Sequence, residues 1–269
     1  MINRAYINLV WRNNRIFTLF SAAFITLFQF MILYLATTFD TAAILSAILD
    51  QLPPMIKAFL NDSFFSMLSY DGAAAFGLSH PIVTTLLVTN TINIPTHHIS
   101  RELESGTLEL LLAHPYRRSS LILSLWTSGA LIILFIVIMA LTGSFVSIFM
   151  FHELTAIVLV RLFEISLNLW LLMMLIFSYT MLIAVYGKTG FKAGNMSAAI
   201  TFFFYLLSFL AQIWSAISFT NYFNIFNYYQ PQKLMFGKGE FLRDILVLFF
   251  IIIILLGLSL RRFGKRDLP

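Results

Sequence analysis

Cysteine is absent from this 269-residue chain, and charged residues make up only 11% of it. Without cysteine the chain has no disulfide, no thiolate metal site and no cysteine nucleophile. Soluble globular domains carry about 25% charged residues, so the low charge argues against a soluble fold. Hydrophobic residues reach 59% of the sequence and include 29 Phe. The composition therefore predicts a polytopic membrane protein.

Six apolar segments predict transmembrane helices and hence an all-α fold. They cover residues 16–39, 81–99, 121–149, 167–186, 196–214 and 241–260, within a single transmembrane domain spanning residues 1–269. Residues 1–15 place Tyr6 and Val10, with Ile2 and Leu9, on one helical face. That pattern predicts an interfacial helix leading into the first span, with a frayed basic N-terminus as the alternative. Residues 40–80 form a predicted long outer loop.

Basic residues are unevenly distributed along the chain. Twelve of the 17 Lys and Arg residues lie in the N-terminus, the 100–120 loop, the 186–193 loop and the C-terminal tail, whereas the remaining segments hold eight of the 12 acidic residues. Because Lys and Arg concentrate in cytoplasmic loops, we expect both termini and the 100–120 loop to be cytoplasmic, and the chain to lie in the cell (inner) membrane. The basic excess then sets topology, and no nucleic-acid partner is expected.

The chain offers no nucleotide, catalytic or metal motif of its own. Gly187-Lys188-Thr189 resembles the end of a phosphate-binding loop, but Leu182 stands where an earlier glycine is required, and no strand precedes it. No Ser/His/Asp set or intramembrane carboxylate pair is placed for catalysis. His97 and His98 lack further ligands at suitable spacing, so no metal site is expected. Any ATP chemistry must therefore belong to another chain.

The second predicted span is unusually polar, because it contains Asn90, Thr91, Asn93 and Pro95. Polar groups at membrane depth usually face protein or a cavity rather than lipid. Asn90 and Asn93 are therefore candidates for lining a translocation path. Hydrogen bonding between helices is the alternative and the more common explanation.

Residues 101–118 form the densest charged segment, between the second and third spans. The second span can continue as a helix and stop at Ser105-Gly106, because glycine is the usual helix stop. Thr107 can cap a new helix over residues 107–113, and Pro115 ends it. The pattern predicts a short cytoplasmic helix lying across the membrane surface.

The composition of this short helix favours docking of a soluble subunit. Its leucines, Leu108, Leu110, Leu111 and Leu112, provide more apolar surface than an exposed loop should carry. Glu109 falls in its first turn, where the helix dipole favours a carboxylate. Glu102 and Glu104 flank it, and carboxylates gain nothing beside anionic lipid. A contact with a protein partner explains both the leucines and the acids.

With these residues the chain resembles the membrane permeases of type-2 ABC exporters. The first cytoplasmic loop of those permeases carries an acidic pair, then Gly-Thr-Leu-Glu-Leu-Leu-Leu, then a proline and basic residues. Here Glu102, Glu104, residues 106–112, Pro115 and Arg117 occupy those places. The resemblance covers the whole chain and is greatest to the single-domain six-span branch associated with nitrous-oxide-reductase maturation and gliding motility. Relatives often have a longer acidic run than residues 101–104.

The resemblance implies half of a transmembrane dimer, paired with a second permease copy or a homologue. Two cytoplasmic ATPase subunits would bind ATP and magnesium, so this chain would bind no cofactor directly. Their closure would push on residues 101–118, tilt spans two and three and drive export. The residues implied in ATPase coupling are Glu102, Glu104, Gly106, Thr107, Leu108, Glu109, Leu111 and Pro115.

Further expected partners are the lipid bilayer and accessory periplasmic or extracellular proteins. No residue pattern selects a substrate. The alternative function is a membrane scaffold that recruits a cytoplasmic protein through the same segment without moving a substrate.

Overall fold

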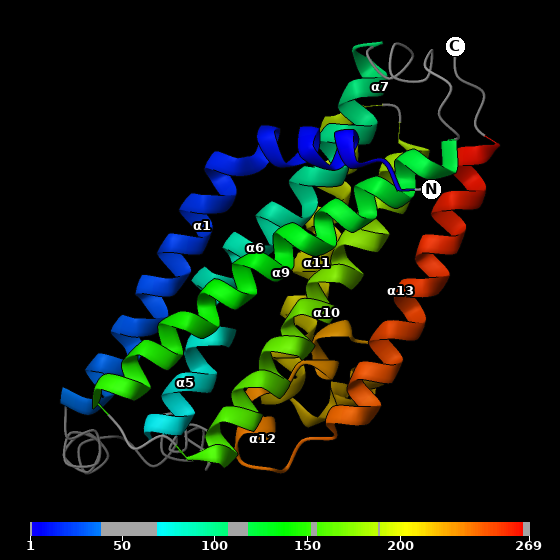
Figure 1. Ribbon diagram of the computed structural model, residues 1–269. Helices are drawn as coiled ribbons and strands as arrows, with labels where there is room; N and C mark the ends of the chain where they lie inside the picture. The colour runs from blue at the N-terminus through cyan, green and yellow to red at the C-terminus, as the bar shows by residue number, and fades with distance from the viewer. Residues whose placement is uncertain (1, 39–68, 107–117, 152–154, 188, 266–269) are drawn as a thin grey trace.

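The computed structural model describes residues 2–38, 69–106, 118–151, 155–187 and 189–265, and these residues form an all-α fold (Figure 1). Six of its helical segments are long and apolar enough to cross a membrane. They are α1 (Arg4–Thr38), a composite segment over Tyr70–Glu104, α9 (Arg118–Phe151), α10 (Ala156–Tyr186), α11 (Gly190–Ile213) and α13 (Phe241–Gly264). The predicted all-α membrane fold with six spans is confirmed.

Helix α1 combines the segment predicted to be interfacial with the first span. Its first turns lie across one end of the bundle, and the rest of the helix then turns to run alongside α9 (Figure 1). Tyr6, Val10 and Asn14 are buried at intervals of four residues. Asn14 Nδ2 donates to the Val10 carbonyl at 2.8 Å, and a side chain that competes for the backbone ladder is a recognised cause of helix bending.

Helices α1 and α9 pack closely because α9 has a glycine, Gly143, at their contact. The Thr26 hydroxyl donates across the interface to the Met139 carbonyl at 2.8 Å. A Cβ added to Gly143 would lie only 2.4 Å from the Thr26 carbonyl oxygen. Small residues permit such backbone approach in membrane helix pairs, so Gly143 sets the α1–α9 spacing.

The second span is built from four consecutive helical pieces. These are α5 (Tyr70–Ser79), α6 (Pro81–Pro95), the π-helix η1 (Thr96–Arg101) and α7 (Glu102–Glu104). His80 separates the first two with an extended ψ of 137°, as expected for a residue that precedes proline. The last part of the predicted outer loop is thus helix α5, whereas residues 39–68 lie outside the described residues.

Helix α5 is held by polar side chains from distant parts of the chain. Gln29 Nε2 donates to the Ala74 carbonyl at 2.8 Å, and Gln232 Nε2 donates to the Gly72 carbonyl at 3.0 Å. Tyr229 donates its hydroxyl to the Leu78 carbonyl at 3.2 Å. Burial raises the pKa of the Tyr229 phenol further above neutral pH.

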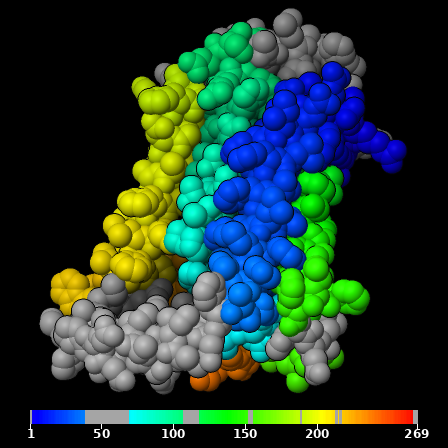
Figure 2. All heavy atoms as spheres, turned by 90° about the vertical axis from the view of Figure 1, so that its left-hand side faces the viewer, coloured from blue at the N-terminus to red at the C-terminus, as the bar shows by residue number. Residues whose placement is uncertain are grey.

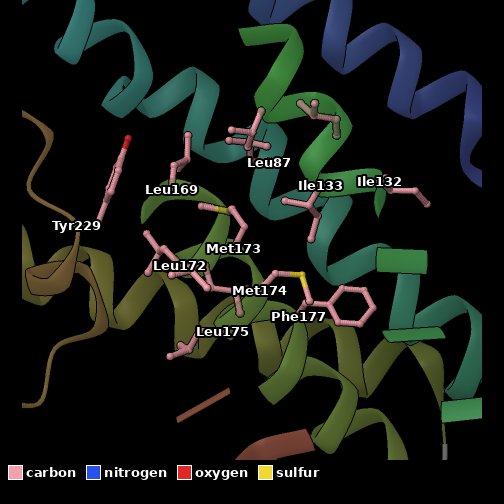
Figure 3. Packing of buried hydrophobic residues seen from close by; sticks show 14 of the residues in the cluster. Leu87, Ile132, Ile133, Leu169, Leu172, Met173, Met174, Leu175, Phe177 and Tyr229 are labelled. Atoms are coloured by element: carbon pink, nitrogen blue, oxygen red, sulfur yellow. The ribbon is translucent and has the colours of Figure 1, made fainter. Parts of the chain in front are cut away.

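Helix α10 lies at the centre of the bundle. In its most apolar window 72% of the residues are buried, against 17% for α11 and for α13. Figure 3 shows Leu169, Met173 and Phe177 of α10 in the same core as Leu87 of α6 and Ile133 of α9. Helix α10 begins at Ala156, earlier than the predicted span, because the Thr155 hydroxyl caps it by accepting from the Val158 amide.

The segment between α11 and α13 folds into three short helices. They are the 3-10 helices η2 (Ser215–Tyr222) and η3 (Ile225–Tyr228), followed by α12 (Pro231–Met235). They lie at the end of the bundle opposite to α7 (Figure 1).

Candidate functional site

Helix α7 projects beyond the other helices at the end of the bundle that also holds the start of α1 and the C-terminal end of α13 (Figure 1). The helix stops where the Ser105 amide donates to the Arg101 carbonyl at 2.9 Å and Gly106 adopts a φ of +71°. Glycine reaches this conformation without strain, which makes it the common helix terminator. The predicted helix stop at Ser105-Gly106 is confirmed.

The predicted coupling segment is only partly described. Residues 107–117 lie outside the described residues, and with them the short transverse helix and five of the predicted coupling residues. These five are Thr107, Leu108, Glu109, Leu111 and Pro115. Glu102, Glu104 and Gly106 have described positions.

Glu102 is turned towards the protein rather than towards solvent. Its side chain is 12% exposed, and its Oε1 lies 2.9 Å from Nδ1 of the buried His98. His98 Nε2 lies 3.3 Å from Asn14 Nδ2 of α1. The same Asn14 nitrogen donates to the Val10 carbonyl, which fixes the orientation of the amide. An amide nitrogen only donates, so His98 Nε2 accepts and its Nδ1–H donates to Glu102.

Glu104 is exposed but also has a partner within the protein. Its Oε2 accepts a hydrogen bond from the Gly190 amide at 3.1 Å. Gly190 is the first residue of α11, so the carboxylate lies at the positive end of that helix dipole. Ser100 adds a third link, because its hydroxyl donates to the Ala184 carbonyl of α10 at 3.2 Å. The end of the second span is thus joined to α1, α10 and α11.

His97, His98 and Glu102 also form a group whose potential ligand atoms lie within 4.8 Å of one another. No metal site was expected from the sequence, where the two histidines have no further ligand close by. Glu102 was not counted as one, although its spacing of four residues from His98 is the signal for a shared helix face. Both ring nitrogens of His98 already have protein partners. We therefore interpret the group as a hydrogen-bonded network joining α1 to α7.

The two asparagines of α6 have different surroundings. Asn90 is 2% exposed, and its Nδ2 donates to Ser21 Oγ of α1 at 2.8 Å. Asn90 therefore makes a hydrogen bond between helices, which was the alternative to lining a translocation path. Asn93 instead lines a groove of about 510 Å³ between α6 and α11. In Figure 2 the groove lies between the cyan and teal spheres of α6 and the yellow-green spheres of α11.

Comparison of the sequence with known protein families agrees with this architecture. A family profile described as "ABC-2 family transporter protein" matches residues 10–268. The chain belongs to the ABC-2 transporter family. It is accordingly a multi-pass membrane permease, a transporter subunit that is not itself catalytic. ABC-2 permeases typically work with a cytoplasmic ATPase. The profile identifies the family and not a branch within it, and a search of curated proteins finds no match.

Proposed function

We propose that this ABC-2 permease is the transmembrane subunit of an ATP-driven exporter, coupled to a separate cytoplasmic ATPase through residues 101–118. The observation that carries the proposal is the projection of α7 beyond the bundle (Figure 1). A soluble subunit approaching this end meets α7 before it meets the other described helices. ATP and magnesium would bind to that subunit and not to the permease.

The contacts of the second span support a mechanical route from α7 into the membrane. Glu102 reaches α1 through His98, Ser100 bonds to α10, and Glu104 bonds to the start of α11. A force on α7 therefore acts on three neighbouring helices as well as on α6. Such rigid coupling fits a switch between inward-facing and outward-facing states.

Surface charge supports a cytoplasmic position for this end. Exposed basic residues surround it, namely Arg4, Arg12, Arg15, Lys192, Arg261, Arg262 and Lys265. By the positive-inside rule we place both termini in the cytoplasm and the permease in the cell (inner) membrane. Phe202 and Phe203 of α11 and Phe249 and Phe250 of α13 are exposed. These apolar faces suit contact with lipid or with the second permease copy of a dimer.

Cross-linking from a single cysteine tests the ATPase contact, because the chain has no native cysteine. A photoactivatable label on Ser105→Cys, at the exposed tip of α7, is expected to capture an ATPase with Walker motifs from native membranes. The same label on Lys238→Cys, exposed after α12 at the opposite end, is the matched control and should capture no ATPase. Capture at Ser105 of a protein without a nucleotide site would support the scaffold function instead.

A further inference from the structure

We propose that the groove between α6 and α11 binds an amphiphile with a phosphate headgroup, whose head lies at Arg101 and whose acyl chain follows the groove. The role of this molecule as a transport substrate depends on the proposed function. Its binding to the groove does not, because binding requires neither ATPase nor nucleotide.

The size and length of the groove fit such a ligand. Its volume of about 510 Å³ lies within the range of about 300–1,000 Å³ found for small-molecule sites. Its lining extends along the second span from Pro81 to Arg101. At 1.5 Å per residue this is about 30 Å, the thickness of the bilayer hydrocarbon.

The walls of the groove suit an acyl chain. Gly194 and Ala198 hollow out the α11 side, and Phe191 and Phe202 of the same helix are exposed beside them. On the α6 side, Thr89 donates its hydroxyl to the Thr85 carbonyl of its own helix at 2.8 Å. The hydroxyl hydrogen of Thr89 is therefore already engaged, and its methyl group adds apolar surface.

The π-helix η1 brings a cation onto this face. Residues five apart are joined by the backbone hydrogen bond of a π-helix and share one face of it, and Thr96 and Arg101 are five apart and both line the groove. In an α-helix the same separation would turn Arg101 about 140° away. The π-turn therefore aligns Arg101 with Asn93 and the rest of the lining. π-turns are frequent at functional sites.

The shape of the neighbouring helix fixes where Arg101 lies. A Cβ added to Gly190 would lie 2.3 Å from Arg101 Cγ. The arginine stem therefore crosses the start of α11 at a point where only glycine leaves room. Glu104 also contacts Gly190, but its carboxylate accepts the Gly190 amide and it does not line the groove.

Polar groups with unused hydrogen-bonding capacity gather towards this end of the groove. Within the part of the chain that the structure describes, the side chains of Arg101, Asn93 and Asn195 make no hydrogen bond or ion pair, and all three line the groove. Among the described residues of the lining, Arg101 is also the single charged one. A guanidinium binds phosphate through paired hydrogen bonds. One charged end and an apolar remainder match the division of an amphiphile into head and tail.

Equilibrium binding to the purified permease in detergent tests this assignment. The probes are radiolabelled oleoyl-lysophosphatidate and oleoylglycerol, which has the same acyl chain but no phosphate. We expect saturable binding of about one lysophosphatidate per chain, at least tenfold tighter than oleoylglycerol. Arg101→Gln should weaken lysophosphatidate binding about tenfold, the size expected for charge-assisted hydrogen bonds, and leave oleoylglycerol binding unchanged. Arg101→Lys should recover part of the loss.

Two further variants separate the groove from the surface. Ala198→Phe should weaken both probes, because it fills the groove. Lys192→Gln removes an exposed charge that is outside the lining, near the same end of α11, and should change neither. Equal affinity for the two probes, or equal losses in Lys192→Gln and Arg101→Gln, would overturn the proposal.

Absence of saturable binding would also overturn it, and an Ala198→Phe variant that splits a permease dimer would then assign the groove to a second copy. A permease that binds lysophosphatidate but captures no ATPase would refute the proposed function and leave this site in place.

Discussion

Glu104 Oε2 accepts a hydrogen bond from the Gly190 amide at 3.1 Å, although the two residues are 86 positions apart in sequence. The bond joins the last residue of α7 to the first residue of α11. Gly190 is buried and packed against the Arg101 stem, so the two helices meet closely at this point. The segment that we propose to contact the ATPase is therefore connected directly to one wall of the groove.

Replacing Glu104 tests this connection. We expect Glu104→Ala to lower the amount of substrate transported per ATP hydrolysed by about fivefold, because a carboxylate at a helix N-terminus contributes about 1 kcal/mol. Glu104→Gln keeps an oxygen acceptor and should retain more of the coupling. Transport and hydrolysis are measured together in proteoliposomes containing the permease and its ATPase. Identical coupling in all three proteins would show that the bond transmits nothing.

The network through His98 predicts a loss of stability. His98→Ala removes the shared partner of Asn14 and Glu102, which lie within the protein. Losing the partner of a buried polar group costs about 1–3 kcal/mol, so the variant should melt at least several degrees lower in detergent. His97→Ala is the matched control, because the His97 Nδ1 atom has no hydrogen bond within the described residues. Equal losses in the two variants would contradict the network.

Apolar runs were sufficient to predict six spans, but helix α5 was not predictable from hydropathy. Asp71, Gly72 and Gly77 make this stretch resemble a loop. Its Ser69 cap is local, but the bonds that hold it in the bundle come from Gln29, Tyr229 and Gln232, at distant positions in the sequence.

In the coupling segment, too, the neighbouring residues in sequence determine some features and the packing of distant helices determines others. Gly106 ends α7 as predicted, because a helix stop is encoded locally. The π-turn before it follows from no propensity in the sequence Thr-His-His-Ile-Ser-Arg. The partner of Glu104 depends on how α11 packs, which a single sequence does not contain.

Close packing of α1 on α9 gives a prediction with an internal control. A Cβ at Gly143 would lie 2.4 Å from the Thr26 carbonyl oxygen, whereas a Cβ at Gly257 would meet no atom within 4 Å among the described residues. Overpacking typically costs about 1–3 kcal/mol, so Gly143→Ala should lower the melting temperature. Gly257→Ala should leave it unchanged or raise it slightly, because alanine favours a helix by about 0.5–1 kcal/mol over glycine. Thermal unfolding in detergent measures both, and similar melting temperatures would contradict the α1–α9 contact.

Asn90 and Asn93 lie about one helical turn apart, but their replacement by leucine should affect different properties: stability for Asn90 and ligand binding for Asn93. Asn90 bonds to Ser21 of α1, and hydrogen bonds between membrane helices contribute about 0.6–1.7 kcal/mol. Asn90→Leu should therefore lower the melting temperature by a few degrees and leave lysophosphatidate binding intact. Asn93 lines the groove, and its side chain makes no hydrogen bond within the described residues, so Asn93→Leu should melt normally but bind lysophosphatidate more weakly. Exchange of these two outcomes would mean that Asn90, and not Asn93, faces the ligand.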